Sequence, residues 1–129
     1  MSLPRGGWKK MGASLALALS VLGAAGFMAP AQAMSLREFA ALEQSDPKTG
    51  EAFANYYLVG ALESALEINA FHVRSGAKPL FCLNGRRLVP SMARSLYATE
   101  LQRNSGLYEA DMGVPLVLTN ALTTVYPCE

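Results

Sequence analysis

Apolar residues at helical spacing define the first predicted element after residue 34. Its apolar positions are Leu36, Phe39, Ala40 and Leu42. Ser35 and Glu38 are three residues apart, as in a capping box, where each side chain accepts a hydrogen bond from the backbone amide of the other residue. We therefore expect a short helix that begins after Ser35 and ends before Ser45.

A long helix is predicted next. Asp46-Pro47 is typical of a helix start, because aspartate caps free amides and proline suits the first turn. The helical pattern continues to about Arg74, and the expected buried positions recur at steps of three and four residues: Phe53, Tyr57, Ala61, Ala65 and Ile68. Gly60 and Ser64 form a notch of small side chains, where a helix of the same chain or of a second copy can approach closely.

Turn signals separate this helix from two more. Lys78-Pro79, Asn84-Gly85 and Val89-Pro90 interrupt the next segment, whose apolar runs of about four residues are too short for a real sheet. Helical patterns return at residues 91–103 and 114–126, and the expected buried positions of the last helix are Leu118, Ala121, Leu122 and Val125. The predicted fold class is all-α, a small bundle of about four helices with one long central helix.

The first 33 residues have a different pattern. Arg5, Lys9 and Lys10 precede an apolar run over residues 11–29, and Ala31-Gln32-Ala33 follows Pro30. A basic start, an apolar centre and a small-x-small site, in this order, describe a secretory signal peptide. An uncleaved membrane anchor is the alternative, since about 19 apolar residues can span a bilayer. The cleavage site and the many Gly, Ser and Ala residues favour the signal peptide. We expect residues 1–33 to be removed and residues 34–129 to form a periplasmic domain that is not held in the membrane.

The charge balance changes with this division. The whole chain of 129 residues has a formal net charge of +1, from 11 Lys and Arg against 10 Asp and Glu. Removing the leader leaves 129 − 33 = 96 residues with 11 − 3 = 8 basic and 10 acidic groups, a net charge of −2. Such a domain lacks the basic stripe of a nucleic-acid-binding protein, so no nucleic-acid partner is expected.

The two cysteines, Cys82 and Cys128, both lie in the part predicted to be exported. An even cysteine count in an oxidising compartment favours a disulfide. A metal or redox pair is disfavoured, because the chain has one histidine and no C-x-x-C motif. We expect a Cys82–Cys128 bridge that reinforces a small core, and neither a metal nor a cofactor.

Residues with catalytic chemistry are few. His72 is the only histidine and stands outside any hydrolase motif, so we interpret it as a boundary or surface residue. Glu63 and Glu67 lie one helical turn apart, an arrangement typical of a solvated helix face and also compatible with a recognition surface. No catalytic residues are predicted. A small exported helical domain of this kind is expected to bind a protein partner rather than to act as an enzyme.

Two loops are candidate partner-binding elements. The first contains Asn84, Gly85, Arg86 and Arg87, which place two cations at a turn. The second spans residues 106–113 and contains Tyr108, Glu109 and Asp111. This second loop is either an exposed binding loop or a connection between helices that packs Leu107 and Tyr108 inward.

Residues 36–128 resemble one known family. The pattern comprises Tyr57-x-x-Gly60-Ala61 in the long helix, Phe81-Cys82, the helix at 91–103, Ala121-Leu122 and the ending Tyr126-Pro127-Cys128. In these features the chain is similar to the type VI secretion amidase immunity proteins, a family of small periplasmic helical proteins.

The resemblance implies a function and partners. It implies a periplasmic protein, often a homodimer, that protects its producer by occluding the active site of a peptidoglycan amidase effector. The element that enters the active site of the amidase is then expected to be the Asn84–Arg87 turn or the loop over residues 107–112. The competing class is a structural or acid-stress chaperone-like periplasmic protein. A small hydrolase would require a role for His72.

Overall fold

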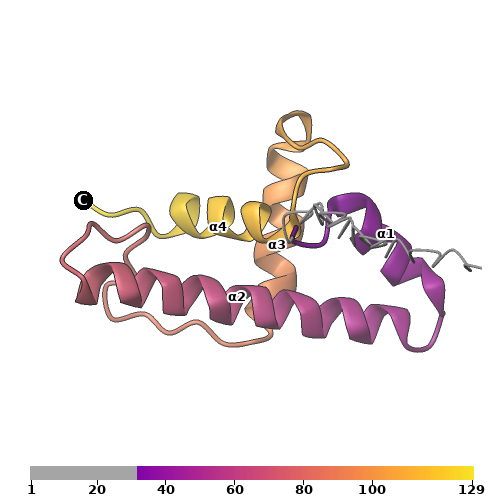
Figure 1. Cartoon of the computed structure of the whole chain (residues 1–129), viewed down its shortest axis with the longest axis horizontal. Coiled ribbons are helices and arrows are strands. Elements are labelled where there is room, and N and C mark those ends of the chain that lie inside the picture. The colour runs from indigo at the N-terminus through magenta and orange to yellow at the C-terminus, as the bar shows by residue number, and fades with distance from the viewer. Residues whose placement is uncertain (1–31) are drawn as a thin grey trace, which may run out of the picture.

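Within residues 32–129, the range that the computed structural model describes, the chain forms four α-helices and no strand. Their order is α1 (Leu36–Ser45), α2 (Gly50–Arg74), α3 (Met92–Arg103) and α4 (Val114–Val125), with a 3-10 turn η1 (Ser105–Leu107) between the last two. Figure 1 shows α4 running alongside the long α2 while α3 crosses both and α1 folds back near the start of α2. The predicted all-α bundle with one long helix is confirmed.

The predicted signal peptide lies almost wholly outside the described residues. The structure therefore describes only residues 32 and 33 of its expected range of 1–33. None of the helices within the described range is long and apolar enough to cross a membrane.

Helix α1 begins at the capping box that the sequence predicts. The Glu38 amide donates to Ser35 Oγ at 3.2 Å, and the Ser35 amide donates to Glu38 Oε2 at 2.8 Å. The second bond lowers the pKa of the Glu38 carboxyl, because a hydrogen-bond donor stabilises the ionised form. The helix ends at Ser45, one residue beyond the predicted boundary.

Helix α2 begins later than predicted. Asp46 Oδ1 accepts hydrogen bonds from the amides of Lys48 (2.7 Å) and Thr49 (3.1 Å), which closes a turn over residues 46–49. The aspartate therefore caps this turn, and the helix starts at Gly50 instead of Pro47. A Cβ atom at Gly50 would lie 2.6 Å from the Leu42 carbonyl oxygen, so α1 and α2 meet at a point where only glycine fits.

The buried face of α2 also differs from the prediction. The fully buried positions are Gly50, Ala54, Leu58 and Leu62. Phe53 and Ile68, placed in the core by the sequence pattern, are exposed, and Tyr57, Ala61 and Ala65 are half-buried. Both sets have helical spacing, so the pattern alone does not select the face; contact with α4 and α3 does.

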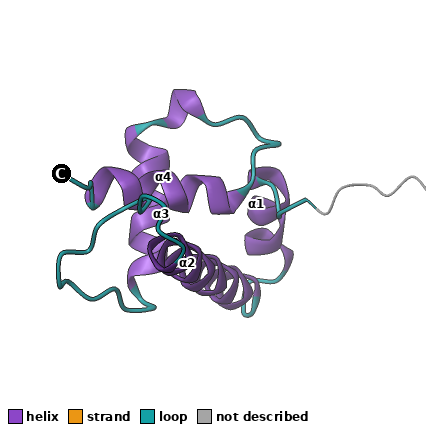
Figure 2. Cartoon of the chain, turned by 60° about the vertical axis from the view of Figure 1, so that its left-hand side comes forward, coloured by secondary structure: helices purple, strands orange, loops and turns teal. Residues whose placement is uncertain are grey.

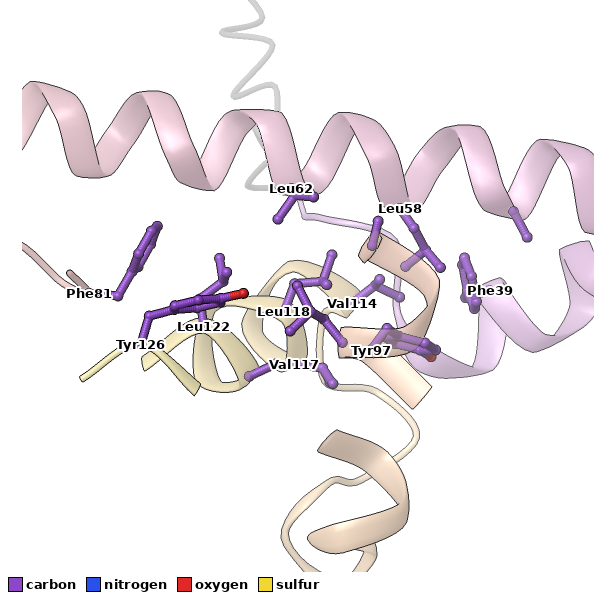
Figure 3. Packing of buried hydrophobic residues seen from close by; sticks show 14 residues of the cluster. Phe39, Leu58, Leu62, Phe81, Tyr97, Val114, Val117, Leu118, Leu122 and Tyr126 are labelled. Carbon is purple, nitrogen blue, oxygen red and sulfur yellow. The ribbon is translucent and has the colours of Figure 1, made fainter. Parts of the chain in front are cut away.

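The core lies between α2 and α4. Figure 3 shows Leu58 and Leu62 pointing from α2 toward Val114 and Leu118 of α4. Phe39 and Tyr97 fill one end, with ring centroids 5.1 Å apart in an edge-to-face arrangement, and Phe81 and Tyr126 fill the other. Burial raises the pKa of Tyr97 to about 12, and the nearby Glu43 carboxylate adds to this effect.

Helix α4 is the most deeply buried element. Its predicted core residues Leu118, Ala121 and Leu122 are buried, and Val114 and Val117 join them. Val125 was expected in the core but is 40% exposed. The helix ends at Val125, and the following residue, Tyr126, occupies the buried position instead.

A polar cluster and a disulfide connect elements around this core. Arg94 of α3 donates to Glu43 of α1 and, through Nε at 2.8 Å, to Asn55 Oδ1 of α2. The Cys82–Cys128 disulfide joins the loop after α2 to the segment after α4 across 46 residues of sequence, so the predicted pairing is confirmed.

Candidate functional site

The first candidate loop is a tight turn, named here the Asn84 turn (residues 83–87). The Arg86 amide donates to the Leu83 carbonyl oxygen at 3.0 Å. Asn84 and Gly85 have φ values of 51° and 79°, both in the left-handed region. Asn-Gly is the residue pair that adopts this geometry most readily, so the sequence itself specifies the turn.

The side chains of the Asn84 turn have different surroundings. The Arg86 guanidinium lies 4.6 Å from the centre of the Tyr126 ring, and its Nε donates to the Leu83 carbonyl at 3.0 Å. Arg86 therefore fastens the turn to the body of the protein. All four residues from 84 to 87 are exposed, so Asn84, Gly85 and Arg87 are available to a partner beside the Arg86 side chain.

Two anchors hold the segment that leads into this turn. Cys82 is bonded to Cys128, and its amide donates to the Tyr126 carbonyl at 2.8 Å. Asn69 of α2 forms the second anchor: its Oδ1 accepts from the amides of Leu80 (2.7 Å) and Phe81 (3.3 Å), and its Nδ2 donates to the Phe81 carbonyl (2.9 Å). Sequence reasoning missed Asn69, because a lone asparagine in a helix carries no motif.

The second candidate loop, over residues 106–113, is anchored by Tyr108. The Tyr108 hydroxyl donates to Glu100 Oε1 at 2.6 Å and accepts from Asn120 Nδ2 at 3.0 Å. Glu100 is 4% exposed and also accepts from Asn104 Nδ2 at 2.9 Å. Burial raises the pKa of the Tyr108 hydroxyl, and the bond to the Glu100 carboxylate raises it further. Tyr108 thus packs inward, as expected if the loop is a connection between helices.

The remaining residues of the loop divide between anchoring and exposure. Asp111 forms an ion pair with Arg37 of α1 at 2.9 Å, and both side chains are largely exposed. The Ala110 carbonyl accepts from the Arg37 amide at 2.9 Å. The interpretation of this loop as an inward-packed connection also placed Leu107 in the interior, but the Leu107 side chain is 67% exposed at the tip of the loop. Glu109 is exposed as well.

The Gly60–Ser64 notch lies on an exposed side of α2, next to the start of α4. Both residues are exposed, and a Cβ atom at Gly60 would meet nothing within 4 Å. Within residues 32–129, therefore, no other helix packs against the notch. It borders a hollow of about 390 Å³ between α2 and the start of α4, lined by residues that include Tyr57, Ile68, Pro115 and Thr119.

The structure does not bring the candidate residues into one site. The segment with the Asn84 turn leads into the start of α3, and the second loop leaves its end (Figure 1). Glu63 and Glu67 are exposed on α2, where Glu67 pairs with Arg74 at 2.5 Å, and His72 Nδ1 lies 3.4 Å from the Lys78 carbonyl oxygen. Residues 32–129 contain no cluster of three or more His, Cys, Asp or Glu side chains placed to hold a metal ion. The described surface thus presents two separate exposed loops, each anchored by side-chain hydrogen bonds.

Comparison of the chain with protein-family models, with curated proteins and with solved structures found no match.

Proposed function

We propose that this chain is a periplasmic immunity-type binding protein that neutralises a peptidoglycan amidase by placing the Asn84 turn in the active-site cleft of that enzyme. The observation that carries the proposal is the construction of this turn. It is a narrow, exposed turn whose base is fixed by a disulfide, by the clamp of Asn69 and by the contact of Arg86 with Tyr126.

Rigidity supports an occluding role for the turn. A binding element that is already ordered loses less conformational entropy on association, so more of the contact energy appears as affinity. The tip residues Asn84 and Gly85 are small enough for a narrow cleft. Arg87 supplies hydrogen-bond donors in a fixed plane, which suits recognition of carboxylate or carbonyl groups at the rim of the cleft.

The test is inhibition of a peptidoglycan amidase encoded beside the gene for this chain. We expect the exported protein to bind that enzyme stoichiometrically and to block its hydrolysis of purified peptidoglycan. Arg87→Glu is expected to weaken inhibition about tenfold or more, as the loss of a central arginine contact does. Lys48→Glu makes the same charge change at the exposed turn between α1 and α2, and is expected to inhibit like the wild type.

Two results would contradict the proposal. One is an amidase that stays fully active in the presence of excess wild-type protein. The other is unchanged inhibition by Arg87→Glu and by a variant whose residues 84–87 are replaced with alanine and glycine, each shown by circular dichroism to be folded. Leu107→Glu then tests whether the tip of the second loop forms the contact instead.

A further inference from the structure

The tip of the Asn84 turn brings together two groups that can react with each other. The side-chain amide of Asn84 is followed directly by the backbone amide of Gly85, and both residues are exposed. Figure 2 shows the loop between α2 and α3, which contains them, extending away from the helices. Asparagine is one of the chemically labile residues of proteins. Attack of the following backbone nitrogen on its side-chain carbonyl carbon closes a five-membered ring, a reaction that needs no enzyme.

Hydrogen bonds distinguish Asn84 from the other asparagines of the chain. All five asparagines lie in the described range, and the side chains of four are hydrogen-bonded to other residues: Asn55, Asn69, Asn104 and Asn120. Within residues 32–129, the hydrogen bonds inside the Asn84 turn come from Arg86, which donates to the Leu83 carbonyl, and none involves the Asn84 side chain. The Asn84 carboxamide is therefore free to turn toward the following amide.

Gly85 supplies an accessible nitrogen. Its amide donates no backbone hydrogen bond in the described part of the chain. By contrast, the residues after Asn55, Asn69 and Asn120 lie inside helices, where each amide is bonded along the helix. Glycine has no Cβ atom to crowd the attacking nitrogen, and a Cβ atom built at Gly85 would meet nothing within 4 Å, so the space around this nitrogen is open.

The turn can open at its tip while its base stays fixed. The attack requires rotation about the Cα–C bond of Asn84, because its present φ of 51° belongs to a left-handed turn. One backbone hydrogen bond, from the Arg86 amide to the Leu83 carbonyl, closes the turn across this bond. A single exposed hydrogen bond contributes little net stability, so the tip opens readily. The Cys82–Cys128 disulfide lies outside the part that moves.

We propose that Asn84 is a deamidation site. The Gly85 nitrogen loses its proton and bonds to Asn84 Cγ, the bond from Cγ to Nδ2 breaks, and the nitrogen of the side chain leaves as ammonia. Water then opens the resulting succinimide. Cleavage of the bond between Cγ and the Gly85 nitrogen gives aspartate. Cleavage of the bond between the backbone carbonyl carbon and this nitrogen gives isoaspartate, in which the chain continues through the former side chain.

The two products change the turn in different ways. Both replace a neutral amide with a carboxylate beside the side chains of Arg86 and Arg87. Aspartate tolerates the left-handed backbone much as asparagine does, so it changes the charge of the tip and retains its shape. Isoaspartate adds a methylene group to the backbone between the fixed Leu83 and Arg87. It therefore displaces Arg87 from its place in the turn.

The consequence for inhibition rests on the proposed function. With the tip of the turn in the cleft of an amidase, a displaced Arg87 and a new carboxylate both weaken binding. Deamidation then gives the inhibitor a limited lifetime, set by the chemistry of Asn84 and Gly85. The modification itself needs no partner, so it can be measured on the isolated protein.

The first test incubates the folded protein, exported from a bacterial host that carries the full gene, at mildly alkaline pH. Peptide mapping by mass spectrometry is expected to show deamidation at Asn84 about tenfold or more faster than at Asn104, which also lies outside the α-helices. Enzymatic methylation of isoaspartyl carboxylates should label the peptide that contains residue 84. Gly85→Ala, shown by circular dichroism to be folded, should slow the reaction, because its methyl group crowds the nitrogen. Equal rates at Asn84 and Asn104, or an Asn84 that stays intact, would overturn the proposal.

The second test follows inhibition of the amidase encoded beside this gene while the protein is incubated. The wild type is expected to lose inhibition in proportion to its isoaspartate content. Inhibition by Asn84→Gln, whatever its initial value, should stay constant, because the longer side chain would have to close a six-membered ring. Complete conversion of Asn84 with unchanged inhibition would refute the limited lifetime. Fresh protein that inhibits no amidase would refute the proposed function, whereas deamidation measured in the first test would still establish the modification.

Discussion

At the scale of single residues, Asn69 connects α2 to the segment before the Asn84 turn through three hydrogen bonds to residues 80 and 81. Glu100 has a comparable role for the second loop, where it accepts from Tyr108 and Asn104. Both are polar side chains that fix a loop to a helix. The Asn69 partners lie 11 and 12 residues away and Tyr108 lies eight residues from Glu100, across loops whose paths no local pattern specifies, so these contacts could not be predicted from a single sequence.

Replacing Asn69 tests the first of these anchors. Asn69→Ala leaves the Leu80 and Phe81 amides and the Phe81 carbonyl without their partners, and we expect the free energy of unfolding to fall by about 1–3 kcal/mol. The measurement is the urea midpoint followed by circular dichroism. Gln102→Ala, at an exposed position of α3, is the control and should shift the midpoint little. An unchanged midpoint for Asn69→Ala would show that the clamp does not stabilise the fold.

The raised pKa of Tyr97 predicts how the free energy of unfolding changes at alkaline pH. Burial, with the nearby Glu43, raises its pKa from the ordinary value of 10.0 to about 12, so the folded state holds the phenolic proton more tightly than the unfolded state. This contribution to stability is fully present below pH 10 and is lost as the pH rises toward about 12. Wild-type protein should therefore lose more stability between about pH 9 and about pH 11.5 than Tyr97→Phe. Urea unfolding at both pH values measures the difference, and identical losses would refute the assignment.

At the scale of elements, the helices could largely be predicted from local pattern and capping. The Ser35–Glu38 box marks the start of α1, and Asn84-Gly85 specifies its turn, because in both cases the determining interactions lie within a few residues. The start and the buried face of α2 could not be predicted this way. Asp46 caps a turn in place of a helix, and the choice between the Leu58 stripe and the Phe53 stripe depends on neighbours far along the chain.

Replacing each of the two glycines of α2 with alanine is expected to change the free energy of unfolding in opposite directions. Gly50→Ala places a methyl group 2.6 Å from the Leu42 carbonyl oxygen, which is backbone and cannot turn aside, so we expect a loss of about 1–3 kcal/mol. Gly60→Ala adds a methyl group in open space inside a helix, and we expect a gain of about 0.5–1 kcal/mol. Thermal and urea unfolding of both variants in dilute solution measure the pair. Equal effects of the same sign would contradict the close approach of α1 and α2 at Gly50.

At the scale of the whole molecule, the disulfide is the largest single constraint that could be read from the sequence. Two cysteines in a chain with a predicted export signal leave one intramolecular pairing, and the structure contains it. The candidate surfaces were less predictable. The Asn84 turn is exposed as a turn signal suggests, but which apolar residues of α2 stay exposed depends on how α3 and α4 pack against it, and local pattern does not determine that.

Removing the disulfide should destabilise the domain substantially. A bond that closes a loop of 46 residues restricts the unfolded chain, which the loop-entropy model values at roughly 4 kcal/mol. We expect the Cys82→Ser/Cys128→Ser protein to unfold at a much lower urea concentration than the oxidised wild type. Reductant should bring the wild type to the same midpoint and leave the double variant unchanged. A double variant as stable as the oxidised protein would show that helix packing alone holds the fold.

The isolated antiparallel pairing of Ser35 with Gly113 links the start of α1 to the start of α4. The Leu36 amide donates to the Met112 carbonyl and the Val114 amide donates to the Met34 carbonyl, both at 2.9 Å, so the start of α1 and the start of α4 are fastened side by side. These amides belong to distant parts of the sequence, but because both bonds break when the two helix starts separate, we expect the amides to open as one cooperative unit. In native-state hydrogen exchange, the protection of Leu36 should therefore follow that of Val114, and fraying of the first helix should be governed by the detachment of the last.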